Sequence, residues 1–210
     1  MKKIMMLMLT LVLMLGIVSS AQAGIYVETL IGGSGEGEYE SHSFDCDSTA
    51  TIIGMDYAFD SVKLGMEYIN GTWEDFLGSD IDFDAYELKA GYAFVNQEDF
   101  KIYGTLGYFN YEYDDYDIEA NGTILGLELD SKLTEKSTLD GSIGFSVNGD
   151  INYFGNREDA DVFLAKLKYT YYFTEKVGLG LGYRYYKASQ DNSGNEFEFS
   201  GFTAGITFKF

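Results

Sequence analysis

The chain has 210 residues, and its 34 acidic residues against 14 basic ones give a net charge of −20. A surface this acidic repels phosphate groups, which excludes nucleic acid as a partner. The single cysteine, Cys46, has no second cysteine to pair with, which excludes a fold held by internal disulfides. The chain has no proline and contains 18 tyrosines and 16 phenylalanines, a composition that favours strands.

Residues 1–23 have the pattern of a secretory signal peptide. Lys2 and Lys3 precede an apolar run over 4–18, and the segment ends in an Ala-x-Ala site at Ala23. We expect cleavage before Gly24, because the apolar run is too short to span a membrane comfortably as an anchor. The domain is then 24–210, with 12 basic residues left against 34 acidic ones and a net charge of −22.

The rest of the chain contains ten stretches in which polarity alternates from one residue to the next. One face of each stretch is apolar and the other is small or charged, which predicts β-strands. The predicted strands are 24–33, 49–59, 62–70, 83–95, 100–113, 120–133, 137–147, 161–173, 176–188 and 197–210. The stretch 100–113 alternates least regularly. No later run is apolar enough for a spanning helix, so a membrane-embedded chain would cross as strands.

The predicted connections alternate between short turns and longer acidic loops. The expected loops are 34–48, 71–82, 114–119, 148–160 and 189–195, with short turns between the remaining strands. The asymmetry is typical of membrane barrels with periplasmic turns and extracellular loops. The sequons that begin at Asn70 and Asn121 fall at predicted turns.

A secreted β-sandwich is the alternative fold, because its strands also alternate. Glycines recur on the polar faces, as at Gly178, Gly180 and Gly182, and a narrow barrel interior needs such small residues. Aromatic residues such as Phe59 and Phe94 stand at strand ends, as in an interfacial belt. The sequence therefore predicts an all-β, antiparallel up-and-down transmembrane barrel of ten strands. Eight strands is the alternative count, with 24–33 or 100–113 wrongly assigned.

The last strand carries a family resemblance. Its apolar face runs through Phe202, Ala204, Ile206 and Phe208 to Phe210. This resembles the terminal strand of bacterial outer-membrane β-barrels, which pairs with the first strand and ends in phenylalanine. By pattern, the whole exported chain resembles small barrels of the OmpA and OmpX kind and porin-like barrels. The resemblance implies a bacterial outer-membrane location, contact with outer-membrane lipid and lipopolysaccharide, and recognition of the Phe210 strand by the barrel-assembly machinery.

Candidate catalytic residues are few. The single histidine, His42, lies between Ser41 and Ser43 and near Asp45. Ten-stranded barrels include the omptin proteases, which need a His-Asp pair and a second acidic pair, but no motif of that family is present. We expect no enzyme activity and no cofactor, with a membrane-embedded hydrolase as the least favoured alternative. Acidic loop segments are candidates for divalent cations, although no calcium-loop spacing occurs.

The side chains expected to point into the barrel include seven acids and seven bases. A balanced set predicts cross-strand ion pairs that fill the lumen, because an unpaired charge away from bulk water is costly. These residues are Glu28, Asp56, Lys63, Glu67, Glu87, Lys89, Lys101, Glu128, Asp130, Asp140, Lys166, Lys168, Arg184 and Lys209. Ten strands leave little free space inside. We therefore expect a filled barrel that acts through acidic loops, in surface interaction or envelope structure, with a narrow cation-leaning pore for small solutes as the alternative.

Overall fold

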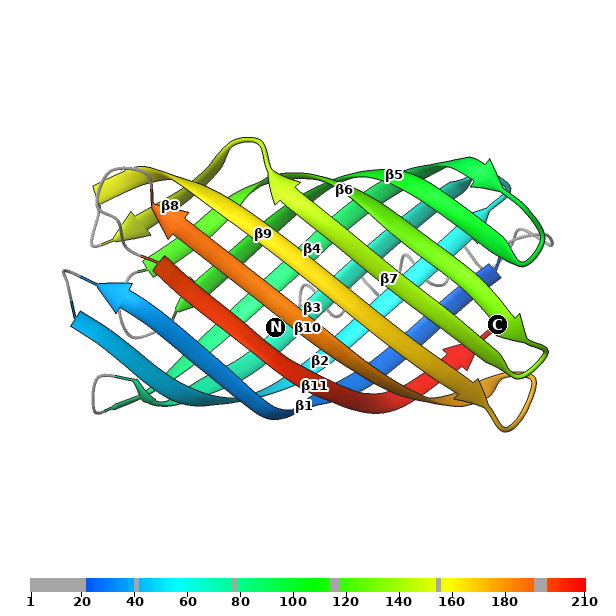
Figure 1. Ribbon diagram of the computed structural model, residues 1–210, viewed down its shortest axis with the longest axis horizontal. Helices are drawn as coiled ribbons and strands as arrows, with labels where there is room; N and C mark the ends of the chain where they lie inside the picture. Colours follow the sequence, from blue (N-terminus) through cyan, green and yellow to red (C-terminus); the bar gives the residue numbers. More distant parts are fainter. Residues whose placement is uncertain (1–21, 40–41, 77–78, 114–117, 154–155, 191–195) are drawn as a thin grey trace.

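The computed structural model describes residues 22–39, 42–76, 79–113, 118–153, 156–190 and 196–210 (Figure 1). Almost all of these residues are in strands. The strands are β1 (Gln22–Tyr39), β2 (His42–Phe59), β3 (Val62–Phe76), β4 (Ser79–Asn96), β5 (Phe100–Tyr113), β6 (Ile118–Thr134), β7 (Ser137–Ser146), β8 (Gly149–Tyr153), β9 (Asn156–Tyr172), β10 (Val177–Gln190) and β11 (Glu196–Lys209). Among the described residues there is no helix long and apolar enough to cross a membrane.

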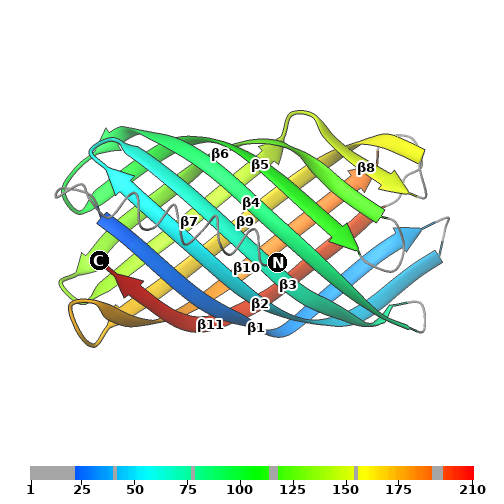
Figure 2. The same ribbon diagram turned by 180° about the vertical axis from the view of Figure 1, so that it is seen from behind.

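The strands form one closed antiparallel barrel (Figures 1 and 2). Consecutive strands pair around the wall, and β1 pairs with β11 from Gly24 opposite Lys209 to Glu38 opposite Glu196. β7 and β8 share one position, because both pair with β6 on one side and β9 on the other. The barrel therefore has ten positions. The predicted ten-stranded barrel is confirmed, and the eight-stranded alternative is wrong.

A bulge separates β7 from β8. The Val147 N–H donates to the Thr123 carbonyl at 2.9 Å, and the Asn148 side-chain oxygen accepts from the Thr123 N–H at 2.9 Å. These hydrogen bonds connect the bulge to β6. The β7–β8 segment has one residue more than β6 at this point. The predicted loop over 148–160 is therefore wrong, because most of it forms β8 and the start of β9.

The strands are longer than predicted at the end away from the short turns. β1, β2 and β4 each contain 18 residues, whereas a tilted strand needs about 9–11 to cross a bilayer. The predicted loops over 34–48 and 71–82 are consequently mostly strand. Asn70 and Asn121 lie inside β3 and β6 and not in turns. Of the predicted loops 114–119 and 189–195, residues 114–117 and 191–195 lie outside the described residues.

The two ends of the barrel differ. Short connections at 60–61, 97–99, 135–136 and 173–176 define what we call the turn end. The first of these turns places Asp60 at a φ of 51°, in the left-handed region. The opposite, longer end is called the projecting end, and it includes β8 (Figure 1).

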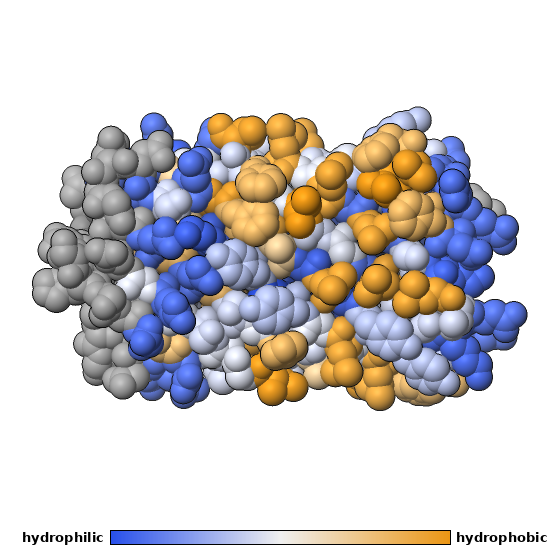
Figure 3. All heavy atoms as spheres, viewed as in Figure 1, coloured by the Kyte–Doolittle hydropathy of each residue, from blue (hydrophilic) through white to orange (hydrophobic). Residues whose placement is uncertain are grey.

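Figure 3 shows an apolar belt across the visible face of the barrel, on the turn-end side of its middle, and exposed apolar side chains continue it on the other strands. Its side chains point outward and are largely exposed, as predicted for Val27, Leu88, Leu106 and Leu181. The small and charged residues between them face the lumen. A surface of this kind suits a hydrocarbon environment outside and a polar interior.

Above the belt the apolar side chains change face. In β4, Leu88 and Tyr92 point outward in the belt, whereas Phe83 and Ala85 are buried inside the projecting end. The aspartates that alternate with these inner residues face outward. The change fits a wall whose outer face contacts lipid at the belt and water at the projecting end, because burying apolar groups away from water is favourable. The projecting end is therefore a closed sheet around a hydrophobic core.

Candidate functional site: a layered lumen

A layer of buried charges crosses the middle of the lumen. Arg184 of β10 binds Glu67 of β3 through both guanidinium ends, with Nη1 2.6 Å from Oε1 and Nη2 2.8 Å from Oε2. Nη2 also lies 3.3 Å from Glu28 Oε2 of β1. The two carboxylates are only 4% and 3% exposed, so this forked, charge-assisted contact replaces their hydration.

Two lysines of β9 complete this layer. Lys166 Nζ lies 2.9 Å from Glu67 Oε1 and 2.6 Å from Glu87 Oε2. Lys168 Nζ lies 3.1 Å from Glu28 Oε1 and 3.8 Å from the centre of the Tyr26 ring. The Tyr26 hydroxyl donates to Glu67 Oε2 at 2.7 Å. Side chains from β1, β3, β4, β9 and β10 are thereby tied together across the lumen.

A second charged group lies on the β3, β4 and β6 side. Lys63 Nζ is 2.5 Å from Glu128 Oε1 and 2.7 Å from Asp130 Oδ1. Lys89 Nζ is 2.7 Å from Glu128 Oε2. The Lys63 ammonium also lies 5.5 Å from the centre of the Tyr103 ring. Sequence reasoning placed the charges here but did not identify Tyr103, which is fully buried and points inward.

Four of the fourteen predicted lumen residues stand apart from these ion pairs. Asp56 and Asp140 have no basic partner within ion-pair distance among the described residues, although Thr138 Oγ1 donates to Asp140 Oδ2 at 3.2 Å. Lys101 donates to the Asp60 carbonyl at 3.3 Å. Lys209 lies 3.7 Å from the centre of the Tyr172 ring. The structure thus separates ten charges that form ion pairs from four that do not.

These four residues line a cavity of about 700 Å³ in the turn-end half of the lumen. Its mouth is bordered by turn residues such as Asp99 and Glu175, and its deep end reaches Arg184 and Glu67. We call this space the vestibule. It is polar and open at the turn end, and the charged layer closes its other end.

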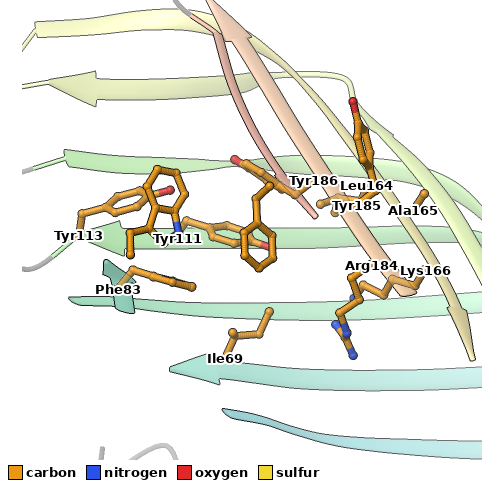
Figure 4. A pocket seen from close by; sticks show the side chains of 12 residues that line it. Ile69, Phe83, Tyr111, Tyr113, Leu164, Ala165, Lys166, Arg184, Tyr185 and Tyr186 are labelled. Carbon is orange, nitrogen blue, oxygen red and sulfur yellow. The ribbon is translucent and has the colours of Figure 1, made fainter. Parts of the chain in front are cut away.

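A hydrophobic plug fills the lumen beyond the charged layer (Figure 4). Trp73 packs edge-on against Tyr113 and Phe83, with ring centres 5.5 Å and 6.2 Å away. Tyr111 and Tyr186 lie 4.7 Å apart. Only about 30 Å³ of free space remains among these rings and the neighbouring Arg184 and Lys166, room for little more than one water molecule. The face change within each strand is the sequence signal that would have revealed this plug.

The outside of the projecting end is strongly acidic. Its exposed acids form what we call the acidic outer wall: Glu36, Asp45, Asp47, Glu74, Asp80, Asp82, Glu112, Asp159 and Asp161. The bases among the described residues of this part are Arg157 and Lys187, which pair with Asp150 and Glu196. Of the acids predicted for loops, these lie on strands, whereas Asp114, Asp115 and Asp117 lie outside the described residues.

Other chemistry at the projecting end is limited. Among the described residues, no three His, Cys, Asp or Glu side chains are grouped so that they could hold a metal ion. Cys46 is buried, with its thiol 3.5 Å from the Gly35 carbonyl, and burial raises the pKa of this thiol to about 11. His42 begins β2, but its side chain lies outside the described part, and a catalytic role for it stays the least favoured alternative.

Comparison with known proteins identifies the fold. No protein-family model and no curated protein matches the chain. The outer membrane protease OmpT from Escherichia coli is similar in structure, with a TM-score of 0.60 and 14% identity over 91% of this chain and 97% of that one. The β domain of the Bordetella autotransporter BrkA has a TM-score of 0.52 and 12% identity over 90% and 99%. With its closed wall and apolar belt, the chain has the fold of the bacterial outer-membrane β-barrels, as its last strand suggested.

Proposed function

We propose that the protein is a non-enzymatic barrel of the bacterial outer membrane, with the turn end in the periplasm and the projecting end outside the cell. The apolar belt supports membrane insertion, and the short turns at one end support this orientation. The signal-peptide pattern in residues 1–23 supports export. In this orientation the acidic outer wall stands just above the outer leaflet.

The sealed lumen supports a function on the outside of the barrel. A solute entering from the turn end meets the charged layer around Arg184 and then the plug around Trp73. Each layer is tightly filled, so the filled barrel is favoured over the cation-leaning pore. The vestibule favours the pore, since it opens the part of the lumen nearest the turn end.

The observation that carries the proposal is the acidic outer wall directly above the apolar belt. Exposed carboxylates at this level face the phosphate-bearing headgroups of lipopolysaccharide across a short gap. Two sets of anions repel unless cations lie between them, and carboxylate and phosphate oxygens are suitable ligands for Ca²⁺ and Mg²⁺. We infer that divalent cations bridge the wall to the lipid, with the lipid supplying part of each coordination shell.

The test compares two triple variants of the refolded protein. Asp47→Asn/Glu74→Gln/Asp82→Asn neutralises neighbouring positions on β2, β3 and β4 of the wall. The matched control, Asp99→Asn/Glu135→Gln/Glu175→Gln, removes the same charge from exposed turn-end positions. In lipopolysaccharide micelles, Ca²⁺ is expected to raise the unfolding temperature of the wild type and the control, because a ligand that binds only the folded state stabilises it. In the wall variant, Ca²⁺ should raise the unfolding temperature much less. Equal Ca²⁺ responses in all three proteins would contradict the proposal.

The non-enzymatic role rests on the composition and on the acidic wall. The chain contains one histidine. Carboxylates on the outside of β4 accept hydrogen bonds from β3, with Thr72 donating to Asp82 of the wall at 2.7 Å and Asn70 donating to the neighbouring Asp84 at 2.8 Å. Such acids stiffen the wall and bind cations. The likeness to OmpT concerns the barrel alone, at 14% identity.

A further inference from the structure

A groove crosses the apolar belt on the β3, β4 and β5 side of the barrel. Its volume of about 480 Å³ falls within the ~300–1,000 Å³ typical of small-molecule pockets. Leu64, Leu88 and Leu106 line the groove, and all three side chains are exposed on the outside of the wall. Ala90 lies between its register partners Leu64 and Leu106. Its short side chain leaves open a space that a larger residue would fill.

The position of the groove determines what fills its apolar part. The belt contacts lipid, so hydrocarbon and not water lies against these leucines. An acyl chain is the elongated apolar group that a bilayer supplies. The groove alone does not distinguish one lipid from another, because all of them carry such chains. Any selection among lipids must therefore come from the polar residues next to the groove.

Polar residues continue the groove toward the projecting end. Tyr108 of β5 and Thr123 of β6 are register partners, and both line the groove. Two residues further along the same face are Asn110 and Asn121, also register partners, about 7 Å beyond. Asn110 Nδ2 lies 2.5 Å from Glu119 Oε1, and Asn121 Nδ2 lies 3.3 Å from the same oxygen. We call Asn110, Glu119 and Asn121 the amide patch.

The amide patch keeps unused hydrogen-bonding groups on the outside of the barrel. Both amides donate to Glu119 Oε1, which leaves Oε2 without a partner among the described residues. Asn121 is half-buried, and its side-chain oxygen can still accept a hydrogen bond. Tyr86 of β4, the register partner of Asn110, has its ring 6.1 Å from that of Tyr108. A headgroup at this level therefore meets free acceptors beside two tyrosines.

The charges around the amide patch decide which headgroup fits. Asp84 and Glu112 are register partners on β4 and β5, and Glu112 is also opposite Glu119 on β6. A bare phosphate is repelled by this set of carboxylates. Sugar hydroxyls carry no charge and donate hydrogen bonds, which is what free carboxylate and amide oxygens require. The patch is thus complementary to a saccharide.

We propose that the groove and the amide patch together bind one glycolipid molecule. One acyl chain lies over Ala90, and the sugar contacts Tyr108, Asn121 and Glu119. The glycolipid is lipopolysaccharide, an identification that rests on the orientation given under the proposed function. This contact involves the sugar and one chain and requires no cation, so it is separate from the cation bridges of the acidic outer wall.

The test follows side-chain amide signals by NMR in protein with isotope-labelled asparagine, folded in dodecyldimethylamine oxide micelles. The probe is dodecyl maltoside, which joins an uncharged disaccharide to a chain of the same length, so any difference comes from the sugar. EDTA is present throughout, so the result does not depend on whether cations bridge the outer wall to lipid. We expect saturable shifts of the Asn110 and Asn121 signals, while the signal of the exposed Asn96 near the turn end stays in place.

Two variants test the two parts of the site. Ala90→Leu fills the groove without adding a polar group and should weaken binding of dodecyl maltoside about tenfold. Ala204→Leu makes the same change in the belt on β11 and is the matched control, which should bind as the wild type does. Asn121→Leu removes the free amide oxygen and should weaken binding to a similar extent, as read from the Asn110 signal.

A heat-modifiable gel shift verifies that each variant is folded. Absence of saturable shifts in the wild type would overturn the proposal, and so would parallel shifts of Asn96, since they would reflect only a changed micelle surface. Wild-type affinity in folded Ala90→Leu would show that the groove holds no chain of this ligand. Wild-type affinity in folded Asn121→Leu would show that the patch does not recognise the sugar, and either result would overturn the site as proposed.

Discussion

At the scale of single residues, the lumen shows how buried charge is tolerated. Glu67 accepts from Arg184, Lys166 and Tyr26, so both of its carboxylate oxygens are used. Burying two or more charges is stabilising only when geometry and hydrogen bonds compensate for lost hydration. The forked contact of Arg184 meets that condition, whereas the pair of Lys187 and Glu196 is partly exposed, with 35% and 44% of the two side chains accessible.

The first prediction at this scale concerns Arg184. Replacing it by methionine keeps most of the side-chain volume but leaves Glu67 and Glu28 without their shared guanidinium. Breaking a buried pair from one side costs about 3–5 kcal/mol, and we expect a loss of that size in the free energy of unfolding. Unfolding by guanidinium chloride of protein folded in lipid vesicles measures this loss.

Lys187→Met is the control, since it removes the charge from an ion pair that is partly exposed. An exposed pair contributes about 0–1 kcal/mol, so this variant should unfold nearly as the wild type does. Equal destabilisation by the two substitutions would show that the central layer does not hold the barrel together.

At the scale of elements, each long strand has two segments with opposite patterns. In β9, Leu167 and Tyr169 point outward in the belt, whereas Val162 and Ala160 are buried in the projecting end. β5 changes in the same way, with Leu106 exposed and Phe109 fully buried. The backbone alternates throughout, so it is the surroundings that change: lipid outside the belt, water outside the projecting end.

The prediction at this scale places one charge at two depths of the same strand and face. Leu167→Arg puts a guanidinium in the belt and should cost about 2–4 kcal/mol if it lies near the bilayer midplane. Asp161→Arg puts the same group on the acidic outer wall and should change stability by no more than about 0.5 kcal/mol. Unfolding from lipid vesicles measures both values, and similar costs at the two sites would mean that the belt is misplaced.

At the scale of the whole molecule, the barrel is a stack of three layers inside one wall. The vestibule is open at the turn end, the charged layer lies in the middle, and the plug fills the projecting end. Closure between β1 and β11 leaves no free sheet edge in the wall. This arrangement places the acidic outer wall at one end of the protein and the open vestibule at the other.

The prediction at this scale is electrical silence. Purified wild-type protein in a planar bilayer should show no steady conductance, because two filled layers lie in series across the lumen. Arg184→Ser/Lys168→Ser removes charges of the middle layer and should destabilise the barrel, while the plug around Trp73 still restricts ion flow. Steady, cation-selective steps from the wild type would favour the narrow pore instead.

The sequence alone determined the barrel, because alternation of polarity is a local property of each strand. Outward Val27 and inward Glu28 follow from a period of two, and ten such runs with short turns predict the closed wall. The same pattern predicts that the fourteen lumen charges point inward. It also placed phenylalanines such as Phe59 and Phe173 at exposed strand ends.

Only the tertiary structure decided which of these charges meet and where the strands end. Arg184 and Glu67 are 117 positions apart in the chain and touch because the wall closes, whereas Lys101 and Asp140 are held apart by Asp130. The predicted loops 34–48 and 71–82 look polar as sequence because their outward residues are acidic and their inward residues include glycines. Their strand character depends on Trp73 and Ile81 packing inside the lumen against residues from other strands. A polar segment becomes a strand when distant partners bury its few apolar side chains, and that burial depends on how the whole chain folds.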